Sequence, residues 1–442
     1  MRRRPVRARM ALELAARSGA AVGRETRAGA AAVARRLRGD LACGAEPTEI
    51  GPLDPDVLAA PYPWYRQLHR GGPVHYHPRL DLWLISHYDQ VRTAARAHDE
   101  LSSAHSVARF RARLPMMLTV DRPEHGRLRR IAARDFTREA MERWRPAIEE
   151  LAREAVGEML SSDASDGALQ LASPLPVAVI ARILGVPTAD LADFRDWSDR
   201  VAEGFGVEPG PGSVRSSARV LGAAVALRGY FAAQFERLRR SPGDDVISRL
   251  IASSEAGALS QDELFWFVFM LLIAGNETTT NLLGTMMLAF AEQPDQYAKV
   301  REDPGLVPDA VEESLRHVSP IQGLSRSAVS GYRVGSATIP AGGRVLLLFG
   351  AANRDPRKYP DPDRFDVERN PSDHVAFGSG IHYCLGAHLA RLEAAVVLRE
   401  LIERVERIEL AGEPVWRDNP SLRGLARLPV RLVASRPAPA RR

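Results

Sequence analysis

The sequence predicts a mainly α-helical protein with minor β-sheets, and three observations support this fold class. Apolar residues recur with helical spacing in seven segments, which are 122–134, 138–160, 188–204, 214–240, 260–292, 308–317 and 385–405. Alternation of apolar and polar residues, which is typical of strands, is confined to two short regions. The 442 residues contain no internal repeat and no linker in mid-chain. We therefore expect a single folded domain over residues 48–442.

The two β-regions and one irregular segment complete the expected elements. The first region holds short alternating runs at 74–77 and 82–85, which predict a hairpin. The second spans 332–349 and contains a Pro-Ala-Gly-Gly turn. Four prolines between residues 353 and 371 exclude a regular helix there, so that segment is expected to be ordered but irregular.

The first 47 residues differ in composition from the rest of the chain. Residues 1–40 hold eleven arginines and three acidic residues, a net charge of +8, whereas the whole chain carries +5. The remainder is therefore slightly acidic, which argues against a nucleic-acid-binding protein. We expect residues 1–47 to form an Arg/Ala-rich extension outside the domain. A transit peptide and a surface-binding amphipathic helix are alternatives.

Two absences in the sequence restrict where the protein works. The longest apolar run, 264–274, has eleven residues, whereas a membrane-spanning helix needs about 18–20. We therefore expect no membrane span. Only two cysteines occur, Cys43 and Cys384, which are too few for a disulfide framework. This cysteine usage favours a reducing, cytoplasmic location.

Cys384 lies in the segment 377–386, which reads FGSGIHYCLG. The glycines on both sides of the cysteine let the backbone approach a flat ligand closely. A helix that begins at Cys384 would direct backbone N–H groups at the sulfur and favour the thiolate. A lone cysteine is otherwise most often a small buried apolar residue. Zinc binding is disfavoured because no second cysteine lies within ligand spacing.

This segment resembles the F-x-x-G-x-x-x-C-x-G motif of the cytochrome P450 family, and supporting matches extend over residues 54–436. The resemblance implies the cytochrome P450 fold, with heme b (iron protoporphyrin IX) between a long central helix and the cysteine loop and helix. It also implies that the Cys384 thiolate is the axial ligand of the heme iron. Phe377, Gly378 and Gly386 are then expected to contact the cofactor.

A second match is the segment 313–316, which reads ESLR and resembles the E-x-x-R element of the family. Four other Glu–Arg pairs in the chain share this spacing, so the spacing alone is a weak signal. The position of Glu313, 71 residues before Cys384, selects this pair. The resemblance implies a buried ion network of Glu313, Arg316 and Arg364 that holds the fold on the heme side.

Within the expected helix 260–292, the segment 274–279 reads AGNETT and interrupts an apolar pattern that later resumes. Taken alone, it also suits a helix end or a solvated turn. A glycine beside a threonine that can bond the preceding turn favours a local opening, with room for dioxygen. An adjacent acid and alcohol suit proton delivery. The resemblance implies that Ala274 contacts the heme, that Thr278 hydrogen-bonds dioxygen and that Glu277 supplies protons.

Cationic residues near the expected cofactor fall into two groups. His125 and Arg129 are one helical turn apart, and the resemblance implies that they bind the heme propionates together with His382 and Arg326. The second group would face outward and form either a solvated surface or a basic strip that receives an acidic redox protein. It comprises Arg127, Arg130, Arg134, Arg354, Arg357 and Lys358.

The predicted function is that of a heme-thiolate monooxygenase, which inserts one oxygen atom from O2 into an apolar organic substrate by hydroxylation or epoxidation. Electrons would come from NAD(P)H through a separate ferredoxin and ferredoxin reductase, because the chain shows no flavin or iron–sulfur domain. A peroxygenase, a heme isomerase and a non-enzymatic heme sensor are alternatives that Glu277 and Thr278 disfavour. By analogy, the substrate pocket is expected to be lined by Met117, Phe269, Ile273, Ile321, Leu324 and Leu422.

Overall fold

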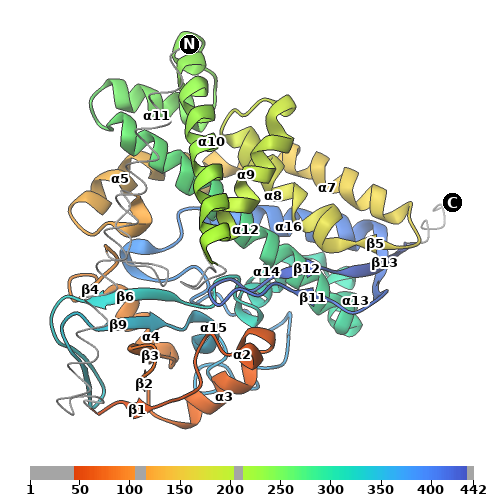
Figure 1. Ribbon diagram of the computed structural model, residues 1–442. Coiled ribbons are helices and arrows are strands. Elements are labelled where there is room, and N and C mark those ends of the chain that lie inside the picture. The colour runs from red at the N-terminus through yellow and green to blue at the C-terminus, as the bar shows by residue number, and fades with distance from the viewer. Residues whose placement is uncertain (1–43, 105–115, 204–212, 436–442) are drawn as a thin grey trace.

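The structure, a computed structural model, describes residues 44–104, 116–203 and 213–435 of the chain. Helices make up most of it, and a smaller strand-rich part lies at one end (Figure 1). The expected fold class is therefore confirmed. Within the described ranges, no helix is long and apolar enough to cross a membrane. Of the expected extension, residues 1–43 lie outside the described ranges.

In chain order, the helices are α2 (Pro55–Ala59), α3 (Tyr62–Arg70), α4 (Tyr88–Arg96), α5 (Glu124–Ala133), α6 (Arg138–Glu142), α7 (Arg145–Leu160), α8 (Pro174–Ile183), α9 (Leu191–Glu203), α10 (Ser213–Arg240), α11 (Val246–Glu255), α12 (Gln261–Glu292), α13 (Pro294–Glu302), α14 (Val307–His317), α15 (Phe349–Ala352) and α16 (Ala387–Arg404).

Each segment with helical periodicity lies in one helix, except 138–160, which splits into α6 and α7. The split falls just before Pro146, which sits in the first turn of α7. Proline is tolerated at that position because the first N–H groups of a helix have no partner within it. Helix α8 is missing from the expectation because it is apolar on nearly every side, so it has no periodic pattern.

The strands are β1 (Glu46–Pro47), β2 (Val74–His77), β3 (Leu82–Ile85), β4 (Leu101–Ser102), β5 (Ser165–Asp166), β6 (Leu324–Ala328), β7 (Tyr332–Val334), β8 (Ala337–Ile339), β9 (Arg344–Leu347), β10 (Val405–Leu410), β11 (Val415–Trp416), β12 (Leu425–Arg427) and β13 (Pro429–Ala434).

The largest sheet has the order β1-β2-β3-β9-β6-β4. Its core is the expected hairpin, in which β2 and β3 are antiparallel and Val74 lies opposite Ile85. Strand β1 pairs with β2 in parallel, so Glu46 and Pro47 belong to the sheet. The domain boundary expected at residue 47 therefore lies too far along the chain, because residues 44–47 already pack on the domain.

The strands after residue 404 were not expected from the sequence. β10 pairs with β13, which also pairs with β5, and β11 pairs with β12 in a separate hairpin. β11 and β12 have only two and three residues, and the sequences of β10 and β13 do not alternate strictly between apolar and polar residues. The β11–β12 hairpin approaches α12, which brings the C-terminal part of the chain to the centre of the fold.

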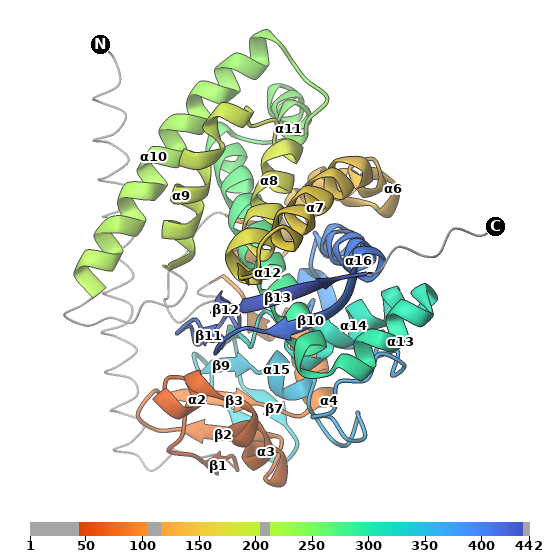
Figure 2. The same cartoon turned by 90° about the vertical axis from the view of Figure 1, so that its right-hand side faces the viewer.

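Helix α12 passes through the middle of the molecule in both views (Figure 1, Figure 2). It begins at a capping box, in which the backbone N–H of Glu263 donates to the Ser260 hydroxyl at 3.2 Å and the Ser260 N–H donates to the Glu263 carboxylate at 2.8 Å. The helix continues through residues 274–279, as expected, but its α-helical structure is unbroken there, so the expected local opening is not seen. It contacts α8, α9, α14 and α16, and therefore provides a fixed wall for the site below it.

Candidate active site

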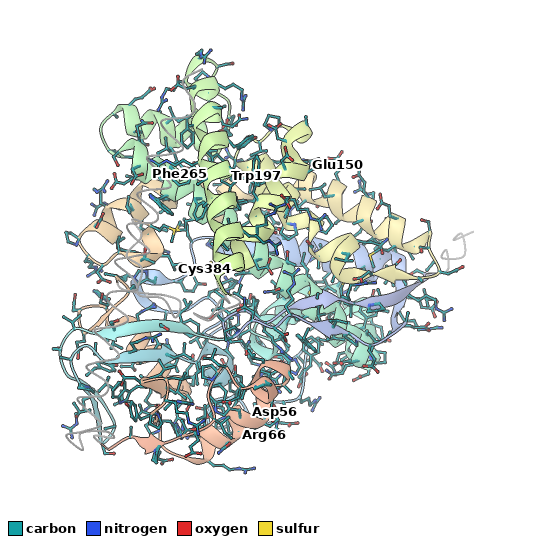
Figure 3. The ribbon with its side chains drawn as sticks, viewed as in Figure 1. Asp56, Arg66, Glu150, Trp197, Phe265 and Cys384 are labelled. Atoms are coloured by element: carbon teal, nitrogen blue, oxygen red, sulfur yellow. The ribbon has the colours of Figure 1, made fainter. Side chains whose placement is uncertain are left out.

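Cys384 lies between a short helical turn, Gly380–His382, and the start of α16, near the junction of the helical and strand-rich parts (Figure 3). Its backbone N–H donates to the Phe377 carbonyl at 2.9 Å. The loop needs glycine at two positions, because Gly378 and Gly380 have φ of 72° and 76°. A Cβ on Gly380 would also come within 2.9 Å of the Ala95 carbonyl oxygen. The loop is therefore held tightly against α4.

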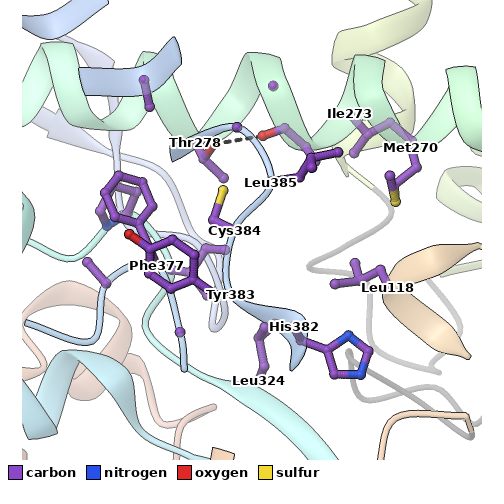
Figure 4. Close-up of a pocket in the computed structure, with 18 of the residues that line it drawn as sticks. Leu118, Met270, Ile273, Thr278, Leu324, Phe377, His382, Tyr383, Cys384 and Leu385 are labelled. Carbon is purple, nitrogen blue, oxygen red and sulfur yellow. Dashed lines mark hydrogen bonds between the residues drawn. The ribbon is translucent and has the colours of Figure 1, made fainter. Parts of the chain in front are cut away.

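The sulfur of Cys384 faces α12 across a cavity (Figure 4). Burial raises the pKa of the thiol, while a hydrogen bond from the Gly386 N–H and the positive charges of Arg129 and Arg391 lower it. Burial has the larger effect, so the free thiol stays protonated. A bound metal ion reverses this balance, because a coordinating thiol loses its proton. Helix α16 begins at Ala387 and not at Cys384 as expected, so one N–H of the loop reaches the sulfur.

The cavity contains about 1900 Å³ of space that protein atoms do not fill, and part of this space is open to solvent. Its floor is the cysteine loop and its roof is α12. It brings together almost every residue that the sequence analysis assigned to the cofactor, the chemistry or the substrate. These are Met117, His125, Arg129, Ile273, Ala274, Glu277, Thr278, Ile321, Leu324, Arg326, Phe377, Gly378, His382, Cys384, Gly386 and Leu422.

Phe269 is the exception among the expected pocket residues. Its ring packs against Phe265 and Trp266, with centroids 5.6 Å and 5.3 Å apart, and it does not line the cavity. The expectation was therefore wrong for this residue. Met270, the next residue along α12, lines the cavity instead, because one residue along a helix turns the side chain by about 100°.

One end of the cavity gathers positive charge. His125 on α5 and His382 in the cysteine loop have ring centroids 4.4 Å apart, beside Arg129 and the buried Arg326 of β6. Burial and the neighbouring positive charges lower the pKa of His125 to about 4 and that of His382 to about 2. Burial also lowers the pKa of Arg326 to about 10. Burial is the largest cause of all three shifts, and an anion bound at this place would oppose them.

The same cluster provides a direct test of whether a dianionic cofactor fits. Both histidines have a buried Nε2 atom without a hydrogen-bond partner among the described residues. No carboxylate in the described part of the chain forms an ion pair with Arg129 or Arg326, although Asp121 attracts Arg326 and His125 from a distance. Buried polar groups normally have partners. Two carboxylates, such as the propionates of heme, would satisfy all four residues, so the site fits that cofactor.

The acid and the alcohol of α12 lie on the opposite side of the cavity from the cysteine loop. The Thr278 hydroxyl donates to the Ala274 carbonyl at 2.8 Å, one turn earlier, as drawn in Figure 4. The Glu277 side chain is 8% exposed and forms an ion pair with Arg417, which follows β11. Sequence reasoning missed Arg417, because nothing in the spacing connects residues 140 positions apart.

The ion network around Glu313 and Arg316 is completely buried. Arg316 donates from Nε and Nη2 to the Glu313 carboxylate at 2.7 Å and 2.8 Å. Arg369 donates to the same carboxylate at 3.3 Å. The expected third member, Arg364, was wrong: its side chain is 53% exposed and pairs with Asp366 at 3.6 Å. Only the Arg364 carbonyl takes part, by accepting a hydrogen bond from Arg316 at 3.1 Å.

Among the residues of the expected basic strip, the outward position is wrong for Arg354, and three others pair with acidic residues. The guanidinium of Arg354 is buried and donates to the His317 carbonyl, while Arg127 pairs with Glu263. Arg357 and Lys358 pair with Asp355 and Asp373. Arg130, Arg134, Arg357 and Lys358 are exposed, and Arg130 and Arg134 form no ion pair that the described residues show. Charge spacing along a helix does not reveal carboxylates that other elements bring close, so these pairs were unpredictable.

The comparisons with known proteins agree with this geometry. The sequence profile of the family described as Cytochrome P450 matches residues 230–432. Beta-dihydromenaquinone-9 omega-hydroxylase of Mycobacterium tuberculosis is 43% identical over 394 residues, which are 89% of this chain and 80% of the relative. Cytochrome P450 monooxygenase PikC of Streptomyces venezuelae is 38% identical over 408 residues, which are 88% of this chain and 95% of the relative.

Solved structures match over a similar extent. CYP109E1 from Bacillus megaterium in complex with testosterone has a TM-score of 0.79 and 33% identity, and covers 85% of this chain and 98% of its own. The chain belongs to the cytochrome P450 family and is a monooxygenase of the heme-thiolate class. The family and fold expected from the cysteine motif are confirmed.

A pair of substitutions tests the corrected ion network. Arg369→Leu leaves part of the buried Glu313 carboxylate unpaired, so we expect the free energy of unfolding to fall by about 2–3 kcal/mol. The matched substitution Arg364→Leu removes an exposed side chain, and the expected change is about 0.5 kcal/mol or less. Urea denaturation of both variants measures the difference. A larger loss for Arg364→Leu would contradict the assignment.

Proposed function

We propose that this chain uses dioxygen to hydroxylate or epoxidise an apolar, lipid-like substrate, with heme b as cofactor and a ferredoxin as electron donor. The observation that carries the proposal is the cavity itself. The Cys384 sulfur lies on its floor and faces its roof, an acid and an alcohol line that roof, and apolar side chains line the space between them. A cytoplasmic location suits this reaction, because NAD(P)H and reduced ferredoxin are available there.

The cofactor proposal rests on the two ends of the cavity. Cys384 would hold the iron, and the cluster of His125, Arg129, Arg326 and His382 would hold the propionates. The sequence has no second cysteine close enough for covalent attachment of a heme, which favours heme b. When bound, the cofactor supplies the electron-rich iron at which dioxygen is activated. The delivery of protons and the binding of substrate are proposed for residues of the chain itself.

Glu277 and Thr278 are proposed to hold protons and move them to the part of the cavity that faces Cys384, where the cofactor would supply oxygen activation. The Thr278 hydroxyl points into the cavity and can accept a hydrogen bond while it donates to the Ala274 carbonyl. The Glu277 carboxyl lies next to it and links the cavity to Arg417, whose side chain is 35% exposed. A positioned acid and hydroxyl of this kind typically accelerate a proton-dependent step by about 10²–10⁴-fold.

An apolar substrate is favoured by the residues that surround the rest of the cavity. Met117, Ile273, Ile321, Leu324 and Leu422 come from separate parts of the chain and converge on the same space. Burial of apolar surface against them is worth about 25 cal/mol per Å². The named relatives are consistent with this class: one is a dihydromenaquinone hydroxylase, and solved neighbours are complexes with testosterone and with myristic acid.

Electron delivery by a ferredoxin is supported by exposed charge near the cysteine loop. A groove between α6, α14 and α16 is lined by five basic residues, of which Arg138, His388 and Arg399 are exposed. The other two are Arg145 and Arg391, which pair with Glu142 and Glu312. Helix α16 begins three residues after Cys384, so a protein docked here would lie close to the metal ligand. Positive charge at this place favours an acidic partner.

The substrate class is tested by optical titration of the heme-loaded protein with a saturated fatty acid, a steroid and a polyprenyl quinone. We expect at least one of them to displace the axial water and shift the spin state, and a sugar to leave it unchanged. Leu422→Gln should weaken that binding about tenfold, because it adds a polar group to the apolar wall. Leu410→Gln, at an exposed position of β10, is the matched control. Equal effects of the two would contradict the assignment.

The proton-delivery step is tested by Thr278→Ala, which removes the hydroxyl with little change in volume. Heme binding and NAD(P)H consumption should continue, whereas the electrons should appear as hydrogen peroxide in place of product. We expect product per NAD(P)H to fall at least tenfold, within the range typical of a lost proton-transfer group. Thr280→Ala, which lies on α12 outside the cavity lining, is the control. An unchanged ratio in Thr278→Ala would remove this residue from the mechanism.

A further inference from the structure

The β11–β12 hairpin holds Arg417 in a fixed orientation. The Arg417 backbone N–H donates to the Gly424 carbonyl at 3.0 Å, and its Nε donates to the Leu425 carbonyl at 3.3 Å. Its Nη1 then reaches across to the Glu277 carboxylate on α12. The backbone and the Nε atom of Arg417 are therefore both fixed by the hairpin, and the Nη1 atom at the end of the side chain contacts Glu277.

The hairpin itself cannot shift easily relative to α12. Gly424 lies so close to this helix that a Cβ would come within 1.7 Å of the Asn281 Oδ1 atom, one turn beyond Glu277. The buried guanidinium of Arg423 stacks on Trp416 at 3.7 Å. It also donates to the carbonyls of Leu58 and Ala59 at 2.6 Å and 2.7 Å, which ties the hairpin to α2. Arg417 is thus carried by a rigid support.

The same hairpin also forms part of the cavity wall. Ser421 and Leu422, at its tip, line the cavity, and Leu422 forms a β-bridge with Ile321. The Gln322 N–H donates to the Ser421 carbonyl at 2.8 Å. One short segment therefore touches the proposed substrate space and holds the proposed proton donor. Leu422, which lines the cavity, and Arg417, which contacts Glu277, are therefore fewer than ten residues apart in the chain.

Glu277 is much more buried than its partner Arg417, and this difference defines the role of Arg417. The Glu277 side chain is 8% exposed, whereas that of Arg417 is 35% exposed. A buried carboxylate is costly unless it is paired. A guanidinium does not release its proton near neutral pH, so Arg417 cannot act as a relay. It can fix the direction of the carboxyl group and connect it to the exposed side of the hairpin.

We propose that Arg417 is the positioning residue for Glu277, which it holds ionised at the boundary between the cavity and solvent. The proposal rests on the proposed proton delivery by Glu277 and adds the residue that makes this delivery directional. Without Arg417, the carboxyl group loses its ion pair with the hairpin and, with it, the contact to a partly exposed guanidinium. Protons then reach the site more slowly, and more of the reduced dioxygen leaves as hydrogen peroxide.

The test uses three variants of the heme-loaded protein. Arg417→Gln removes the charge, Arg417→Lys restores it with a shorter reach, and Arg427→Gln changes an exposed arginine of the same hairpin that pairs with Asp166. We expect product per NAD(P)H to fall about tenfold in Arg417→Gln, to recover to within about threefold of wild type in Arg417→Lys, and to stay unchanged in Arg427→Gln. Heme content and substrate affinity should change less than twofold in all three.

Two further readouts separate positioning from a structural effect. Arg417→Gln should have no additional effect on the ratio when Glu277→Gln is already present, because the two residues act as one unit. Infrared difference spectroscopy of the protein without turnover should show an additional protonated carboxyl band in Arg417→Gln relative to wild type, and this addition should disappear in the Arg417→Gln/Glu277→Gln double variant. The comparison is a difference because burial raises the pKa of Glu393 well above its ordinary value, so its carboxyl absorbs in every variant.

Several results would overturn the inference. These are a wild-type ratio in Arg417→Gln, a loss that Arg417→Lys does not recover, or an effect that persists in the Glu277→Gln background. The proposed function is tested separately by Glu277→Gln alone. If that variant keeps the wild-type ratio while Thr278→Ala does not, oxygen insertion stands, whereas proton delivery by Glu277 and the role of Arg417 both fail.

Discussion

The rest of the structure depends on one arrangement, in which the Cys384 sulfur faces α12 across a cavity wide enough for a flat macrocycle. Neither side of this arrangement is free to move. The cysteine loop is pressed against α4 at Gly380, where a Cβ would lie 2.9 Å from a backbone carbonyl. Helix α12 is packed against α8, α9, α14 and α16. The buried pair of Glu313 and Arg316 joins α14 to the irregular segment that leads into the cysteine loop.

Electrostatics divide the cavity into regions with different tasks. The cluster around Arg326 is unfavourable without an anion, because Arg326 is buried and the charges of Arg326 and Arg129 repel the protonated form of the two histidines. Binding of a dianionic cofactor relieves this repulsion, so cofactor binding should contribute to the stability of the folded chain. The roof of the cavity, formed by α12, carries almost no charge apart from Glu277. The partner of Glu277, Arg417, comes from the β11–β12 hairpin. Because the cluster around Arg326 and Glu277 lie in different parts of the cavity, the substrate space stays apolar while one acid remains available for proton delivery.

The sequence predicted the local features well and the long-range pairs poorly. The cysteine motif was readable because its function depends on ten consecutive residues, and α12 was readable because its apolar pattern resumes after residue 279. Arg369 and not Arg364 completes the ion network, because the path of an irregular segment depends on hydrogen bonds that no periodicity encodes. Arg417 was missed for the same reason. Phe269 was misplaced because a turn of about 100° decides which neighbour on a helix faces the cavity.

The most direct measurement is the absorption spectrum of the reduced, carbon monoxide-bound protein, compared between the wild type and Cys384→His. The central claim is that the Cys384 thiolate is the ligand of the heme iron. Wild type should then show the red-shifted Soret band of a thiolate-ligated heme. Cys384→His should retain bound heme but lose that band, because an imidazole donates less electron density to the iron. A red-shifted band that persists in Cys384→His would show that another residue binds the iron and would contradict the account.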